Sequence, residues 1–255
     1  MKRFTNKTII VTGSSGGIGE AIARRFASEG ANVVLNSRNR ADCEEVAKDL
    51  DDARTLIVEG DVSKSDFAAE IVSKAMAKFG GLDVLINNAG VAGMGMLADA
   101  KDSEIDRIID INVKGVLYLS RAAIPELLKT KGNIVNISSV SGLGGDWSLP
   151  IYNASKGAVT NLTRSLALQL GAQGVRVNCI CPSMTRSDMT AGLTENEHAM
   201  KALKNRMPLG RAAEPDEIAG PTLFLASEDA GFVTGVNLPV DGGVSASNGQ
   251  PNFFG

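Results

Sequence analysis

Tyr152 and Lys156 are the two side chains whose types and spacing suggest chemistry. They lie four residues apart, so on a helix they would lie on one face, one turn apart. A phenol is a weak acid at neutral pH, but a fixed ammonium beside it favours the phenolate. Such a pair can exchange a proton with a bound substrate. Taken alone, the pattern is also typical of a solvated helix face.

A glycine-rich run from Thr12 to Gly19 predicts a phosphate-binding turn, because it lies between an expected strand and an expected helix. In such a turn one glycine permits the sharp bend, a second lets the backbone approach a pyrophosphate, and a third allows the helix to pack closely on the strand. The helix adds free N–H groups and the positive end of its dipole. The residues expected to bind a dinucleotide here are Gly13, Ser15, Gly17, Ile18 and Gly19.

The end of the second expected strand bears on which dinucleotide binds. An NAD site usually has an acidic residue here, about 20 residues after the glycines, that holds the ribose hydroxyls. This chain reads Asn36-Ser37-Arg38-Asn39-Arg40, with no Asp or Glu before Asp42. A 2′-phosphate would meet the Ser37 hydroxyl and the Arg38 guanidinium. The sequence therefore favours NADP (NADPH), with NAD possible; the alternative is that Arg38 only caps a surface loop.

Short apolar runs alternate with helical patterns along nearly the whole chain, which is typical of a parallel sheet covered by helices. We therefore predict an α/β fold: a doubly wound, seven-stranded parallel sheet with helices on both faces, in a single domain over residues 1–255. The expected strands are Thr8–Val11, Val33–Asn36, Thr55–Glu59, Val84–Asn87, Asn133–Ile137, Val175–Cys181 and Gly235–Pro239. The expected helices are Ile18–Glu29, Arg40–Leu50, Lys64–Phe79, Ser103–Leu128, Tyr152–Gly171 and Pro215–Leu225.

Composition argues against several classes of function. The net charge of −3 comes from 26 basic and 29 acidic residues without a basic run, so no nucleic-acid partner is expected. No apolar stretch is long enough for a bilayer, and the amino terminus does not read as a signal peptide, so we expect no membrane partner and a cytoplasmic location. Cys43, Cys179 and Cys181 do not form a disulfide framework, and a single histidine, His198, leaves a metal site without ligands.

Further motifs occur in a fixed order, and with the glycine turn they resemble the short-chain dehydrogenase/reductase family over essentially the whole chain. Ser139 precedes Tyr152 by thirteen residues, as the family's catalytic serine precedes its tyrosine. The other matching positions are Asp61-Val62, Asn87-Asn88-Ala89-Gly90, Asn112 and Tyr152-x-x-x-Lys156. One departure is Pro182-Ser183, where the family commonly has Pro-Gly; the hydroxyls expected to contact the nicotinamide amide are then those of Thr185 and Ser187.

The resemblance implies a Rossmann fold and an oxidoreductase with Tyr152 as proton donor and acceptor. It implies that Ser139 donates a hydrogen bond to the substrate oxygen and that Lys156 supports the phenolate and binds the nicotinamide ribose. Asn112 would hold a water that links Lys156 to solvent, although it could also only bond backbone at a helix kink, and Ser139 could only cap a turn. The cofactor-binding residues implied after the glycine turn are Ser37, Arg38, Asp61, Val62, Asn88, Ala89, Gly90, Tyr152, Lys156, Pro182, Thr185 and Ser187.

The family's substrate walls correspond here to residues 91–96, 140–149 and 188–207, which are small and apolar with several methionines and no cationic cluster. They favour a small, largely apolar ketone or secondary alcohol. Gly192 and Pro208 suit residues 188–207 to a lid that orders on binding.

Two alternatives to this activity remain open. One is a 3-oxoacyl-(acyl-carrier-protein) reductase of fatty-acid synthesis, although residues 168–174, where such enzymes often carry basic residues, have no positive charge. The more remote one is a non-catalytic dinucleotide-sensing protein, which would not need all four catalytic residues. The resemblance and two long apolar helices also predict a homotetramer, and Phe253-Phe254 are expected to dock, for instance on a neighbouring subunit.

Overall fold

The computed structural model describes residues 2–250, so Phe253-Phe254 lie outside it. All seven strands form one parallel sheet in the order β3-β2-β1-β4-β5-β6-β7. The order reverses between β1 and β4, and such a reversal opens a crevice at the carboxyl ends of the strands. The predicted doubly wound sheet is therefore confirmed. The strands are β1 Thr8–Val11, β2 Asn32–Ser37, β3 Thr55–Glu59, β4 Val84–Asn87, β5 Asn133–Ile137, β6 Arg176–Pro182 and β7 Asn237–Val240.

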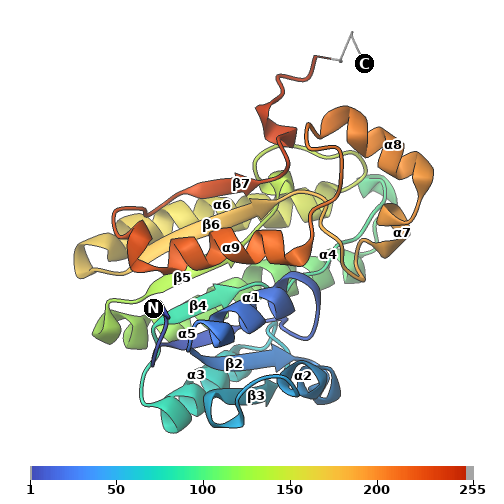
Figure 1. The fold of residues 1–255 in the computed structure, drawn as a ribbon. Coiled ribbons are helices and arrows are strands. Elements are labelled where there is room, and N and C mark those ends of the chain that lie inside the picture. The colour runs from blue at the N-terminus through green and yellow to red at the C-terminus, as the bar shows by residue number, and fades with distance from the viewer. Residues whose placement is uncertain (1, 251–255) are drawn as a thin grey trace.

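Helices cover both faces of the sheet because successive strand residues point to opposite sides. Ile9 and Val11 of β1 pack against α1, α2 and α9, whereas Ile10 between them packs against α3, α5 and α6. Figure 1 shows α1 and α9 side by side over one face. The helices are α1 Gly17–Ser28, α2 Arg40–Ala47, α3 Ser65–Phe79, α4 Asp102–Ile109, α5 Gly115–Thr130, α6 Pro150–Leu170, α7 Ala191–Thr194, α8 Glu197–Arg206 and α9 Pro215–Ala226.

The single long helix predicted over Ser103–Leu128 is interrupted. A π-helical turn over Asp110–Lys114 separates α4 from α5. Within this turn the Asn112 side chain bonds the backbone of Val91, a contact from a distant segment that the periodicity of the helix does not reveal. The turn places Asn112, a buried residue, beside Val91, and π-helical turns are frequent at functional sites.

The remaining differences from the predicted elements are small. β6 begins and ends one residue later than predicted, and β7 begins at Asn237 rather than Gly235. The expected lid, residues 188–207, contains the two short helices α7 and α8, which lie together away from the sheet (Figure 1). No helix within residues 2–250 combines the length and apolar character needed to cross a membrane.

Candidate active site

A cavity of about 450 Å³ opens at the carboxyl ends of the central strands. All the residues predicted to bind the cofactor line it, and so does Ser139. Asn112, which is 1% exposed, lies behind the wall. The structure thus brings together segments that follow β1, β2, β3, β4, β5 and β6, as the sequence predicted. The further lining residues are Gly16, Asn36, Asn39, Asp42, Gly60, Val91, Ile111, Ile137, Ser138, Ser183, Asp188, Met189 and Thr190.

Two glycines of the turn that lines this cavity leave no room for a side chain. Gly13 has φ +61°, and a Cβ on it would lie 2.9 Å from the Cα of Ala89. A Cβ on Gly19 would lie 2.1 Å from the carbonyl oxygen of Gly13, so α1 packs directly on the turn. No side chain within residues 2–250 caps the amino terminus of α1 at Gly16. Its first N–H groups are therefore available to an anionic ligand, which fits a pyrophosphate.

Hydrogen bonds between β1 and β4 hold this turn in place. The Asn88 side-chain amide donates to the carbonyl oxygens of Thr12 and Gly13, both at 2.9 Å. In return, the Thr12 hydroxyl accepts from the backbone N–H groups of Asn88 at 3.0 Å and Ala89 at 3.1 Å. The backbone of the glycine turn is thus fixed before any ligand arrives, which lowers the ordering cost of binding.

One end of the cavity lies beyond β2, the strand next to β1. Arg38 is exposed here, whereas the neighbouring Arg40 pairs with Glu44 at 2.8 Å. The Ser37 hydroxyl donates to the carbonyl oxygen of Asn39 at 2.8 Å. Asp42 also lines this end, and one of its carboxylate oxygens accepts from the Asn39 amide at 2.9 Å. This end therefore presents the exposed Arg38 guanidinium, together with a hydroxyl and a carboxylate that are both already hydrogen-bonded.

Tyr152 and Lys156 lie on α6, which begins with Pro150 in its first turn. Lys156 is 5% exposed, and its ammonium donates to the carbonyl oxygen of Ile137 at 2.9 Å. The Lys156 Nζ lies 5.6 Å from the centroid of the Tyr152 ring. A buried positive charge thus stands beside a phenol at the cavity wall. The two side chains thus lie near each other on one helix, as their four-residue spacing predicted.

Ser139 follows β5, where its side chain both caps a turn and lines the cavity. Its hydroxyl oxygen accepts from the backbone N–H of Ser141 at 3.1 Å and so caps the short helical turn Val140–Gly142. The same side chain lines the cavity with Tyr152. Ser138, in contrast, points its hydroxyl at the carbonyl oxygen of Lys156, at 3.0 Å.

Asn112 uses its amide to hold neighbouring backbone. The side chain accepts from the N–H of Val91 and donates to the carbonyl oxygen of Val91, both at 2.8 Å, and also donates to the Ser155 hydroxyl at 3.0 Å. A Cβ on Gly90 would lie 3.4 Å from both Asn112 Oδ1 and Lys156 Nζ. Bonding of backbone at a helix irregularity, the alternative considered for Asn112, is therefore present, and its predicted water relay to Lys156 stays a prediction.

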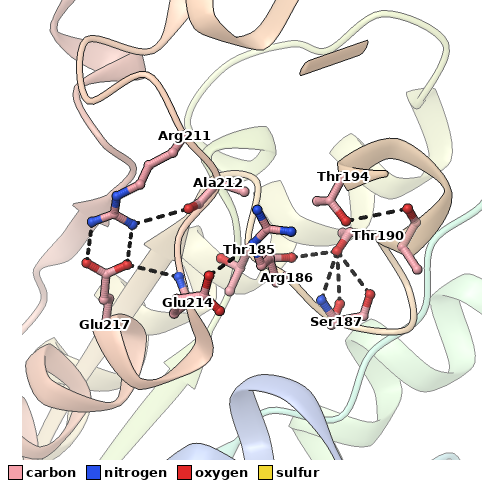
Figure 2. A network of polar contacts seen from close by, with 10 residues as sticks. Thr185, Arg186, Ser187, Thr190, Thr194, Arg211, Ala212, Glu214 and Glu217 are labelled. Atoms are coloured by element: carbon pink, nitrogen blue, oxygen red, sulfur yellow. Dashed lines mark hydrogen bonds and ion pairs between the residues drawn. The ribbon is translucent and has the colours of Figure 1, made fainter. Parts of the chain in front are cut away.

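The segment after β6 joins the cavity to the lid. The Thr190 hydroxyl donates to the carbonyl oxygen of Thr185 at 2.6 Å and accepts from the N–H of Ser187 at 3.0 Å. At the base of the lid, the carbonyl oxygen of Ala213 accepts from the N–H of Arg186 at 2.9 Å, and the Arg186 side chain pairs with Glu214 at 3.0 Å. Figure 2 shows the contacts of Thr190 and the pair formed by Arg186 and Glu214, and the lid leaves and returns at this point.

Sequence reasoning missed three polar residues near the site. Thr190 contacts both predicted hydroxyl residues, Thr185 and Ser187. Ser141 contacts Ser139 and donates its hydroxyl to the Asp146 carboxylate. The hydroxyl residues Ser183, Thr185 and Ser187, which recur just before Thr190, were a usable signal for it. Asp146 follows two glycines in a loop, where spacing does not predict contacts.

A family model described as enoyl-(acyl carrier protein) reductase matches residues 13–245 of the chain. Meso-2,3-butanediol dehydrogenase of Serratia marcescens is 47% identical over 251 residues, which cover 98% of this chain and 99% of that protein. A 3-oxoacyl-(acyl-carrier-protein) reductase of Chlamydia muridarum is 39% identical over 250 residues, covering 95% of this chain and 98% of that protein.

Solved structures match the same fold over nearly the whole chain. A short-chain dehydrogenase/reductase from Brucella melitensis, described as a glucose/ribitol dehydrogenase, superimposes with a TM-score of 0.91 at 37% identity, covering 96% of this chain and 99% of that chain. A short-chain dehydrogenase/reductase of unknown function from Caenorhabditis elegans, solved with cofactor, gives a TM-score of 0.87 at 32% identity, covering 97% and 98%.

Proposed function

The chain belongs to the short-chain dehydrogenase/reductase family and is an oxidoreductase of alcohol and ketone groups, and on that premise we propose that it interconverts a small, uncharged secondary alcohol and its ketone, with NADP(H) as the preferred cofactor. The observation that carries the proposal is one cavity lined at one end by the glycine turn and elsewhere by Ser139, Tyr152 and Lys156.

A bound nicotinamide dinucleotide would supply the hydride in reduction and accept it in oxidation. In reduction, the Tyr152 hydroxyl gives its proton to the carbonyl oxygen. The buried ammonium of Lys156 stabilises the phenolate that remains, since it lies 5.6 Å from the ring centroid. The Ser139 hydroxyl donates a hydrogen bond to the same substrate oxygen and stabilises the negative charge that develops on it. In oxidation the Tyr152 phenolate takes up the proton of the alcohol.

The substrate class follows from the walls near Tyr152 and from the Serratia marcescens relative. Val91 and Met189 are apolar residues that line the cavity together with Ser139 and Tyr152, which suits a small, largely apolar substrate. The relative is named for meso-2,3-butanediol. We therefore expect 2,3-butanediol and its oxidation product 3-hydroxybutan-2-one to be substrates. The second hydroxyl of these substrates lies on the carbon next to the reacting one, and it adds little volume and no charge to the molecule.

The test is a panel of small ketones and alcohols with each of the four nicotinamide cofactors. Turnover of 2,3-butanediol or 3-hydroxybutan-2-one supports the proposal. Tyr152→Phe is the matched control, because it keeps the ring and removes only the hydroxyl. It should lower kcat by about 1,000-fold, while the Kd for NADPH, measured by fluorescence titration, should stay within about twofold. Normal turnover in Tyr152→Phe would exclude this residue as proton donor.

The runner-up activity is reduction of 3-oxoacyl groups on an acyl carrier protein, which the Chlamydia muridarum relative favours. The end of α6 speaks against it, because residues 168–174 carry no positive charge to meet an acidic carrier. Acetoacetyl-pantetheine should accordingly be a poor substrate. NADPH consumption only with acylated pantetheine or acylated carrier protein would mean that the function is reduction of 3-oxoacyl groups on a carrier protein. No turnover of any alcohol or ketone would favour a protein that only senses the dinucleotide.

The preference for NADP is supported by Ser37 and Arg38 at the end of β2, both on the cavity wall. A guanidinium pairs well with a phosphate, and an acidic residue would instead repel it. Arg38→Asp should raise the KM for NADPH at least tenfold and leave the KM for NADH unchanged or lower. Arg40→Asp is the matched control, because Arg40 pairs with Glu44 outside the cavity. Unchanged KM values for both cofactors in Arg38→Asp would exclude this interpretation.

A further inference from the structure

A chain of polar contacts connects Ser139 to the loop before α6. The Ser139 hydroxyl donates to the Ser141 hydroxyl oxygen at 3.0 Å, and the Ser141 hydroxyl donates to the Asp146 carboxylate. The backbone N–H of Ser141 also donates to the Ser139 hydroxyl oxygen, at 3.1 Å. Ser141 is buried, at 5% exposed, whereas Asp146 is exposed. Two hydrogen bonds thus join the serines, and a third joins this pair to a carboxylate.

The direction of each bond follows from the number of protons. A hydroxyl has one proton, and an ionised carboxylate can only accept. The Ser141 proton therefore goes to Asp146, because a hydrogen bond to a charged acceptor is the stronger one. The Ser141 hydroxyl can then only accept a hydrogen bond from Ser139. Ser139 therefore acts as the donor in the contact between the two hydroxyls, while its oxygen is held by the Ser141 N–H. The carbonyl oxygen of Pro182 is a second, longer acceptor for the Ser139 proton, at 3.4 Å.

The loop that carries Asp146 is held at several points, although its side chains are exposed. The Asn153 amide donates to the carbonyl oxygen of Ser141 at 3.0 Å and to that of Gly144 at 2.9 Å. On its other side, the carbonyl oxygen of Ser148 accepts from the N–H of Gly95 at 2.9 Å. The backbone on both sides of Asp146 is therefore fixed, so its carboxylate is presented to Ser141 from a defined position.

We propose that Asp146 is a positioning residue that acts through Ser141 to keep the Ser139 hydroxyl a hydrogen-bond donor. This rests on the proposed role of Ser139. When a substrate oxygen enters, the Ser139 proton turns from Ser141 to that oxygen, while the Ser141 N–H keeps the Ser139 oxygen in place. Without the carboxylate, the Ser141 hydroxyl is free to rotate and to donate to Ser139, and the donor is no longer preorganised.

Asp146→Ala should lower kcat about tenfold, which is less than the loss of a whole oxyanion donor. The Kd for NADPH and the melting temperature should not change, because the side chain is exposed. Asp146→Asn keeps an oxygen that can accept from Ser141 and should restore kcat to within about threefold of the wild type. A role confined to loop stability predicts instead a lower melting temperature. A role of bulk negative charge predicts no rescue by Asn. Either result would overturn the proposal.

A double-mutant cycle with Ser141 decides whether Asp146 acts through that residue. In a Ser141→Ala background, Asp146→Ala should change kcat by less than about twofold. Losses that multiply would mean that Asp146 acts by another route, and the inference would be wrong. The proposed function is judged separately by Ser139→Ala and Tyr152→Phe in the otherwise unchanged enzyme. If those variants keep full turnover the function fails, and if only the cycle is additive the inference alone fails.

Discussion

Several side chains around the cavity hold local backbone and also face the expected substrate. Ser139 caps the turn after β5 and lines the cavity, and Lys156 bonds the carbonyl oxygen of Ile137 while placing its charge near Tyr152. A side chain with such a structural bond loses little further freedom when substrate binds. Under the proposed mechanism, these side chains would therefore need little rearrangement when substrate binds.

The close packing of the glycine turn predicts a large difference between two glycine substitutions. Gly19→Ala should lower the free energy of unfolding by about 3 kcal/mol, because its Cβ would lie 2.1 Å from the Gly13 carbonyl oxygen and force the turn apart. Gly16→Ala is the matched control. Gly16 has φ −176°, and a Cβ added to it would meet nothing within 4 Å, so we expect a loss below about 1 kcal/mol. Urea denaturation measures both, and equal losses would contradict the packing argument.

Some residues of the candidate site were predictable from the sequence and others were not. Gly13, Ser139, Tyr152 and Lys156 were predictable because short motifs of fixed spacing carry them between recognisable elements. Ser141 and Asp146 were not, because their contacts depend on the path of an irregular loop. Nothing in the sequence itself indicates that path, which is held by hydrogen bonds from Asn153 and Gly95.

At the scale of elements, strands were easier to predict than helix interruptions. Strands buried on both faces are short continuous apolar runs, so β1, β3, β4 and β5 have the predicted bounds. The π-helical turn around Asn112 keeps nearly the same apolar spacing as an α-helix. Asn112 in this turn contacts Val91, which only the folded chain brings near.

The lid is the element we expect to move. Helix α8 has no buried residue, so its local stability should be low. Trypsin should cleave the ligand-free protein first after Lys201, Lys204 or Arg206, which are all exposed. Saturating NADP⁺ with an alcohol substrate should slow this cleavage roughly tenfold or more, because ordering the lid removes the extended conformations that proteases need.

Mass spectrometry of the fragments identifies the cleavage sites. Cleavage after Lys74 on α3 serves as the internal control, since that helix has a buried apolar face and opens only with the whole domain. Equal rates with and without ligands would mean that residues 188–207 do not act as a lid.

At the scale of the molecule, the two faces of the sheet have separate apolar cores, and Cys43 lies in the one under α1 and α2. Burial raises the pKa of the Cys43 thiol to about 11, above its ordinary value near 9. The folded state thus keeps the thiol protonated where the unfolded state begins to lose the proton. The stability from this difference is complete below about pH 9 and is lost as the pH rises towards 11.

The free energy of unfolding should therefore fall between pH 9 and 11, and it should fall less steeply in Cys43→Ala, which has no thiol to titrate there. Urea denaturation at several pH values measures both slopes. Parallel slopes for the two proteins would show that Cys43 does not contribute to the pH dependence.

We predict that the chain forms a homotetramer in which α5 and α6 contact their copies in other subunits. Both helices cover the same face of the sheet, yet Leu117 on α5 is 44% exposed and Leu168 on α6 is 87% exposed. Large apolar side chains at such positions are typical of surfaces that a further subunit covers.

Light scattering should give four times the 26.6 kDa of one chain. Leu168→Glu should dissociate the assembly because it would bury a charge, whereas Leu209→Glu, at a position 68% exposed and outside these helices, should not. A wild-type mass of one chain would contradict the tetramer, and an intact Leu168→Glu tetramer would place the contact elsewhere.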